Sequence, residues 1–338
     1  MIEIIREDLI GVLSKVKPGL AKKEIVEEAT RFVFTDDTIM TFNDQIAIIC
    51  PFKTGLECSI PADTFYKIIG KISAEKIKFN EKENSLSISG GKTKGNIEIS
   101  TGEEIRKRVD ATGAYKINDW KKLPKDFIDG LYLCLFSVSN DASDILFNIS
   151  FDGAYITSSD DVRISEYEFE NGDLGTNFLM PGSAAMELVK FSPEWFYVGK
   201  SWVYFKTKED IIFCSRIIDE EYPNFVSAFD FEGTELILPE GLKKAVETAE
   251  VLADGDFDTD KWIMVEVDKN KIRCRGERDS GWIEYEMETK FKGDRLVFEI
   301  NPAFFKEVLD KTETVIIGED RAIFTAEGFK HLISLPVE

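Results

Sequence analysis

The sequence predicts an α+β fold of three repeated domains, each with two helices packed against antiparallel sheets. Three stretches, which begin at Cys58, Phe178 and Val297, carry one pattern: an apolar, strand-like run meets a proline, and apolar residues then fall on one helical face. Equivalent apolar positions recur 120 residues apart, so the chain is a threefold repeat. The three apolar faces are Phe65, Ile68 and Ile69; Ala185, Leu188 and Val189; and Phe305, Val308 and Leu309.

The first third of the chain reads as helix, strands, helix, strands. After a short strand at 2–5, the i, i+3, i+4, i+7 spacing of an apolar stripe predicts a helix, which Pro18 and Gly19 end. Short strands with polar turns follow at 31–52 and 76–100, on either side of the helix after Pro61. The stripe is Leu9, Val12, Leu13 and Val16.

The second and last thirds repeat this order of elements. Each begins with a helical stripe, continues with strands, and contains one of the proline helices. Polar stretches separate the thirds, which predicts domains at 1–118, 119–232 and 233–338. The two stripes are Ile128, Leu131, Tyr132 and Leu135, and Leu242, Ala245, Val246 and Ala249.

Acidic residues outnumber basic ones, 63 to 42, and the formal net charge is −21. This charge disfavours nonspecific adhesion to nucleic acid or to anionic membranes. The charge is unevenly placed, because residues 1–118 carry 18 basic and 18 acidic residues whereas residues 119–234 carry 9 and 21. A local basic surface is therefore still allowed.

The five cysteines are scattered and never form a CxxC pair, which is typical of a reduced, cytoplasmic protein. The N-terminus has no basic leader, and no apolar run approaches the roughly 18 residues of a membrane span. We expect a chain that is neither exported nor embedded in a membrane.

Local matches to chemical motifs are weak. Residues 91–93, Gly-Lys-Thr, lack the earlier glycine of a phosphate loop and precede a strand, so they predict a hairpin turn. The alternating aspartates at 254–260 lack the glycine and glutamate of a calcium loop and predict a solvated acidic loop. His331 stands in an apolar strand pattern and is interpreted as structural or exposed. The sequence predicts no catalytic centre, metal site or cofactor, and so favours a binding or mechanical function over an enzyme.

A family resemblance appears at residues 216–225, RIIDEEYPNF. This stretch resembles the segment that closes the second domain of bacterial DNA polymerase sliding clamps of the β type: a basic residue, two aliphatics, an acid, two variable positions, an aromatic, proline, and Asp or Asn. The three-domain length, the proline helices and the apolar ending at 333–337 are also similar to that family.

The resemblance implies a DNA polymerase processivity factor. Its subunits would form a head-to-tail homodimer, closed into a ring around duplex DNA, with helices lining the hole and strands outside. Lysines on the inner helices would meet phosphates weakly enough to slide, while the acidic outside repels DNA. The candidate DNA-binding residues are Lys22, Lys23, Lys67, Lys71, Lys121, Lys122, Lys125, Lys190, Lys243, Lys244, Lys306 and Lys311.

The resemblance also implies a groove in which DNA polymerase and clamp loader bind through short peptide motifs. Two departures border it: the Gly-His pair of the family's Thr-Asp-Gly-His-Arg-Leu run is lost at 159–164, and the chain ends in Glu338 instead of arginine and leucine. Such drift suits a divergent or phage-encoded clamp with its own polymerase motif. The candidate groove residues are Arg163, Ile164, Pro223, Ile333, Leu335, Pro336 and Val337, although Leu335 and Val337 could instead complete the core of the third domain.

Ring closure is expected where the strand at 95–100 pairs with the third domain of a second copy, because edge strands pair readily. The candidate interface residues are Ile97, Ile99, Val251 and Leu252. Two rival functions remain open. An acidic DNA mimic or protein-binding inhibitor would not encircle DNA, and an enzyme built on repeated α+β units would need a catalytic centre.

Overall fold

The computed structural model describes residues 2–255, 257 and 259–336. It divides into two compact units, each of which is described by itself: residues 1–125 with 183–219, and residues 126–182 with 220–338. Each unit holds one eight-stranded and one four-stranded sheet, and the strand pairs within them are antiparallel. None of the helices among the described residues is long and apolar enough to cross a membrane.

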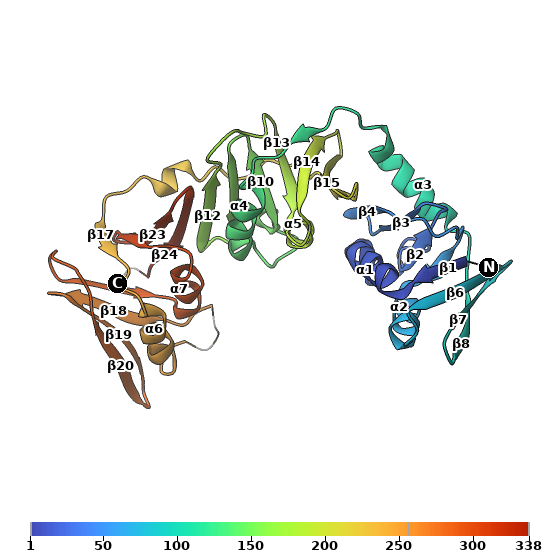
Figure 1. The fold of residues 1–338 in the computed structure, drawn as a ribbon. Helices are drawn as coiled ribbons and strands as arrows, with labels where there is room; N and C mark the ends of the chain where they lie inside the picture. The colour runs from blue at the N-terminus through green and yellow to red at the C-terminus, as the bar shows by residue number, and fades with distance from the viewer. Residues whose placement is uncertain (1, 256, 258, 337–338) are drawn as a thin grey trace. The chain divides into compact units, whose positions relative to one another are not determined.

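The four-stranded sheet of the first unit has the order β1-β6-β7-β8, which leaves β8 at one edge (Figure 1). The turn between β7 and β8 holds Gly91 at φ +57°, so the predicted hairpin at 91–93 is confirmed. The strands are β1 (Ile2–Ile5), β6 (Lys76–Lys82), β7 (Ser85–Gly90) and β8 (Thr93–Glu98).

The eight-stranded sheet of the first unit joins strands from the first and second thirds of the chain. The junction is β4 with β16, in which Ile49 lies opposite Ile212 and Ile46 opposite Ser215. In sheet order the strands are β5 (Ser59–Pro61), β2 (Arg31–Phe34), β3 (Thr38–Phe42), β4 (Ile46–Pro51), β16 (Ile212–Arg216), β15 (Trp202–Thr207), β14 (Pro193–Val198) and β9 (Lys121–Lys122).

The eight-stranded sheet of the second unit joins the second and last thirds in the same way. Its junction is β12 with β24, in which Arg163 lies opposite Ile333 and Tyr167 opposite Phe329. In sheet order the strands are β13 (Asn177–Pro181), β10 (Asn148–Asp152), β11 (Tyr155–Ser159), β12 (Arg163–Glu168), β24 (Phe329–Ser334), β23 (Arg321–Ala326), β22 (Thr314–Ile317) and β17 (Thr234–Ile237).

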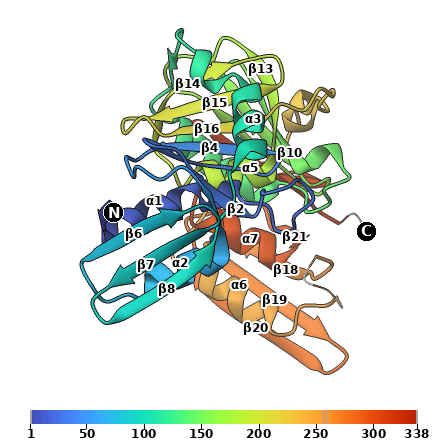
Figure 2. The same ribbon diagram turned by 90° about the vertical axis from the view of Figure 1, so that its right-hand side faces the viewer.

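The four-stranded sheet of the second unit has the order β20-β19-β18-β21, and α6 (Leu242–Glu250) lies across one of its faces (Figure 2). A Cβ atom at Gly276 would collide with the carbonyl oxygen of Ala249, so glycine allows this helix to approach β19 closely. The strands are β18 (Ile263–Asp268), β19 (Lys271–Arg278), β20 (Gly281–Glu288) and β21 (Leu296–Ile300).

Helices at the predicted repeat positions confirm the threefold pattern. They are α2 (Ala62–Lys71), α5 (Gly182–Leu188) and α7 (Pro302–Leu309), which begin 120 residues apart. Their prolines are not equivalent, because Pro302 is the first helical residue whereas Pro61 and Pro181 end the preceding strands. The apolar stripes predicted for α1 (Arg6–Val16) and α6 are also confirmed, since their residues are buried except Val12, which is partly exposed.

Two predictions about helices were wrong. The chain forms α3 (Glu103–Thr112), which was not predicted. In α4 (Phe127–Cys134), the buried face is made of Phe127, Leu131 and Cys134, whereas Tyr132 is 60% exposed. The predicted boundaries at 118 and 232 lie outside helices and strands, and the three-domain division stays a prediction.

Candidate functional site

The candidate DNA-binding lysines lie on or beside helices, with two exceptions. Lys121 and Lys122 form β9 at the edge of the eight-stranded sheet, where they lie opposite Phe196 and Trp195. The expectation that these two lie on a helix was wrong, because the backbone pairs with β14 and α4 begins only at Phe127. The others lie on or just after α2, α5, α6 and α7, in the loop after α1, or, for Lys125, just before α4.

Among the described residues, carboxylates pair with four of the twelve candidate lysines. The ammonium of Lys67 lies 2.5 Å from Asp63 on α2, and that of Lys190 lies 2.6 Å from Glu187 at the end of α5. Across α6 and α7, Lys243 pairs with Asp310 and Lys306 pairs with Glu250. A phosphate must compete with these carboxylates for each lysine, so these helices attract DNA more weakly than the number of lysines suggests.

Lys22 and Lys23 differ from the paired lysines. Both are exposed in the loop after α1, and no ion pair joins either of them to another described residue. Free cations of this kind release counterions fully when they meet a phosphate.

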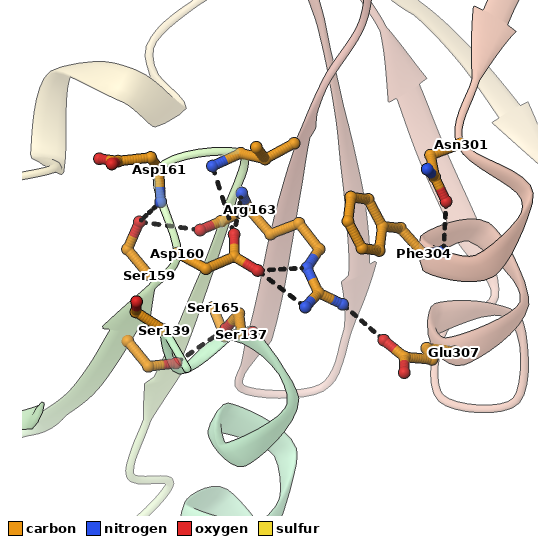
Figure 3. A network of polar contacts seen from close by, with 12 residues as sticks. Ser137, Ser139, Ser159, Asp160, Asp161, Arg163, Ser165, Asn301, Phe304 and Glu307 are labelled. Carbon is orange, nitrogen blue, oxygen red and sulfur yellow. Dashed lines mark hydrogen bonds and ion pairs between the residues drawn. The ribbon is translucent and has the colours of Figure 1, made fainter. Parts of the chain in front are cut away.

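The candidate groove residues Arg163 and Ile164 lie on opposite faces of β12, because successive side chains of a strand alternate. Arg163 lies on the face that α4 and α7 cover. Its guanidinium lies 2.7 Å from Asp160 and 2.5 Å from Glu307 of α7, and 4.0 Å from the centre of the Phe304 ring (Figure 3). Only 9% of the Arg163 side chain is exposed, so this residue holds α7 on the sheet and is not an open groove wall.

Ile164 lies on the opposite face, which we call the connector face. There Ile164, Ile323 and Leu332 form an apolar cluster, and the segment at 220–233, the connector, packs over it. The connector leads to β17, includes the short 3₁₀ helix Val226–Phe229, and supplies Phe225, Ala228, Phe229 and Phe231 to the cluster. Pro223 lies on the connector beside a cavity on this same face.

The C-terminal candidates do not join this surface. Ile333 is fully buried in the hydrophobic core formed by the last third of the chain, so its assignment to a groove was wrong. Leu335 also belongs to that core, as the alternative interpretation expected, and with Pro336 it borders a cavity of about 470 Å³ beside Phe298 and Gly318. Val337 lies outside the described residues.

The candidate interface residues lie in two different settings. β8 and β20 are edge strands of their sheets, as ring closure by strand pairing requires. Val251 is 67% exposed and Leu252 partly exposed after α6. Ile97 and Ile99, at 7% and 5% exposure, face the core of their own domain, so they could support an interface only through the backbone.

His331 is structural, which is one of the two alternatives that the sequence left open. It is fully buried, its Nδ1 lies 2.8 Å from Ser165 Oγ, and its ring centre lies 4.6 Å from that of Phe136. Burial, together with the nearby Arg163 and Lys311, lowers the pKa of the imidazole well below its usual value.

The five cysteines are free and buried as small core residues, and burial raises the pKa of the Cys58 thiol to about 12.

Sequence comparison does not assign this chain to a family, since no family model and no curated protein matches it. Solved structures match it from end to end. The DNA polymerase sliding clamp from Bacillus subtilis has a TM-score of 0.85 at 16% identity, with 100% of this chain and 99% of that chain covered. The β subunit of the Streptococcus pyogenes DNA polymerase has a TM-score of 0.84 at 18% identity, with both chains fully covered.

This chain has the sliding-clamp fold. A third match, the Helicobacter pylori β clamp bound to a DNA ligase peptide, has a TM-score of 0.82 at 16% identity and covers both chains completely. The sliding-clamp fold confirms the predicted α+β class and the repeated domains. Sequence analysis missed the aromatic residues of the connector, which three phenylalanines within the seven residues at 225–231 could have indicated.

Proposed function

We propose that this chain is a DNA sliding clamp, a non-catalytic processivity factor of the cytoplasm. Two copies close head to tail around duplex DNA and tether a polymerase to it. The observation that carries the proposal is the end-to-end agreement with clamp structures, which leaves no part of the chain for a separate catalytic domain. Topology, and not affinity, holds the DNA in such a ring.

The charges of the described residues support sliding. Strong binding to phosphates would stop a ring from moving, whereas Lys67, Lys190, Lys243 and Lys306 are each held by a carboxylate. The exposed Lys22 and Lys23 are among the candidate lysines without an ion pair to another described residue, and they supply part of the remaining attraction. The result is a surface that keeps DNA centred at low energetic cost.

Ring closure uses the two free edges in this proposal. β8 of one copy pairs with β20 of the other, and the exposed Val251 packs beside this junction. Partner proteins, including the polymerase and the clamp loader, bind by short peptides on the connector face, where the exposed Pro223 and Val226 of the connector offer apolar contacts beside the cavity. The relative from Helicobacter pylori, bound to a DNA ligase peptide, supports this mode of binding.

Retention on circular DNA tests the proposal. The protein is loaded on a nicked plasmid with the clamp loader of its host and washed at high salt, and the plasmid is then linearised. A clamp stays on the circle and leaves the linear DNA. An acidic DNA mimic would bind neither form, and an ordinary DNA-binding protein would leave both in high salt, so either result would contradict the proposal.

A further inference from the structure

A cavity of about 510 Å³ opens on the connector face, next to the apolar cluster. Its floor is a row of side chains that lie opposite one another on neighbouring strands: Ser150 and Thr157, Thr157 and Glu166, and Glu166 and Lys330. The connector forms the wall, with Tyr222, Pro223, Phe225 and Phe229 among the residues that line it.

Negative charge dominates this cavity. Asp152, Glu166 and Glu221 line it, whereas Lys330 is the one basic residue among the lining residues. The ammonium of Lys330 lies 3.7 Å from Glu166, too far for a strong hydrogen bond, and half of the Lys330 side chain is exposed. Burial raises the pKa of the Glu166 carboxyl, so its charge is only partly compensated. A second cation would relieve this imbalance.

Aromatic rings complete the site. Tyr155, which is 37% exposed, stands on the floor, and Phe225 and Phe229 border the cavity from the connector. Aromatic faces attract ammonium and guanidinium groups, and the chain already uses this contact, since Lys330 lies 5.8 Å from the centre of the Phe229 ring. The three carboxylates repel phosphate, so DNA does not fit.

We propose that this cavity receives a lysine or arginine side chain of a partner polypeptide, paired with Glu166 and Asp152. This inference rests on the proposed function, because it adds a charge requirement to the peptides that bind on the connector face. The exposed Pro223 and Val226 of the connector line the same cavity, and an apolar side chain of the same peptide packs on them, which selects a polypeptide over a free polyamine.

The geometry also sets the position of the basic residue. Pro223 and Val226, which meet the apolar side chain, line the same cavity as Glu166 and Asp152, so both peptide side chains enter one cavity. Alternate side chains of an extended peptide lie about 6.6 Å apart. The basic residue therefore lies one or two positions from the apolar anchor.

A random heptapeptide library displayed on phage tests this inference with the full-length protein. We expect the selected peptides to carry Lys or Arg within two positions of Leu or Phe. In fluorescence anisotropy, changing that basic residue to Gln weakens binding by about tenfold, the ratio that 1.4 kcal/mol of lost ion pairing produces. The double variant Glu166→Gln, Asp152→Asn binds the Lys and Gln peptides equally well.

Glu168→Gln is the matched control, because Glu168 lies on the same strand and face but outside the cavity. This variant keeps the preference for the basic peptide, and an unchanged circular dichroism melting curve shows that each variant is folded. Three results would overturn the inference. They are a selection that yields no peptide, selected peptides without a preference for Lys or Arg, and displacement of the basic peptide by spermidine at equal concentration. Retention of the protein on circular DNA is measured on the same preparation. This measurement tests the sliding-clamp proposal independently of the peptide-binding inference, so the failure of one can be told from the failure of the other.

Discussion

Arg163 and Glu307 connect two elements that are far apart in the sequence. Their side chains lie 2.5 Å apart, which ties β12 of the middle third to α7 of the last third (Figure 3). The guanidinium also holds Asp160 at 2.7 Å and stacks on Phe304. This cluster stabilises the junction at which β12 and β24 join the middle and last thirds of the chain in one sheet.

The first prediction concerns this cluster. Arg163→Ala should lower the free energy of unfolding by about 3 kcal/mol, because it leaves the mostly buried Asp160 without its partner. Glu307→Gln should cost less than about 1 kcal/mol, since its side chain is 49% exposed and solvent screens the pair. Urea unfolding checks the order of the two effects. Equal losses, or a larger loss for Glu307→Gln, would contradict this role of Arg163.

The second prediction concerns pH. The folded state holds the pKa of His331 well below its usual value. Below the usual pKa, the histidine is therefore protonated in the unfolded chain and stays neutral in the folded chain. Stability is therefore unaffected above pH 6.5 and falls as the pH drops below it, by about 1.4 kcal/mol per pH unit.

His331→Asn is the control for this effect, because His331 is the one histidine of the chain. The amide of the introduced asparagine can still form a hydrogen bond with Ser165. Urea unfolding at pH 6.5 and pH 5.5 should show the loss in the natural protein and a smaller loss in the variant. The same slope in both proteins would mean that another group titrates.

The third prediction separates free from paired lysines. Changing Lys22 and Lys23 together to Gln should flatten the salt dependence of DNA association, by a slope of about 0.9 for each phosphate that is no longer neutralised. Changing Lys243 and Lys306 to Gln should have a smaller effect, because each already pairs with a carboxylate. Fluorescence anisotropy on a short duplex from 25 to 200 mM salt, about the range in which such interactions weaken, measures both. A larger effect of the paired lysines would reverse the assignment.

The fourth prediction concerns ring closure. Val251→Asp should give a folded monomer, because this side chain is exposed in the single chain. Ile97→Asp should instead unfold the first domain, because Ile97 is 7% exposed and a buried carboxylate is costly. Light scattering reports the mass of the assembly, and circular dichroism reports folding. A stable dimer of the Val251→Asp variant would place the interface elsewhere.

Periodic features were predictable from the sequence. The stripe of α6 is buried as its spacing predicts, and α2, α5 and α7 start at the predicted interval. The missed α3 also had a local signal, since Glu103 and Lys107, and Glu104 and Arg108, are ion pairs four residues apart.

The candidate groove was harder to predict because it depends on contacts between distant segments. Alternation along β12 separates Arg163 from Ile164, a rule that sequence analysis could have applied. The pairing of β12 with β24 joins residues 162 to 170 positions apart, and no local pattern sets that register. This pairing buries Ile333 and lets the connector pack on Ile164. The structure was therefore needed to find the partner surface.

Threading onto DNA with blocked ends tests encirclement most directly and needs no loader. Concentrated protein is mixed with a linear duplex biotinylated at both ends, streptavidin is added to block the ends, and the DNA is washed at high salt. We predict that the protein stays bound until a restriction enzyme cuts the duplex, and that none is retained when streptavidin is added first. Equal retention for both orders of addition, or loss of the protein from the blocked duplex, would contradict the account.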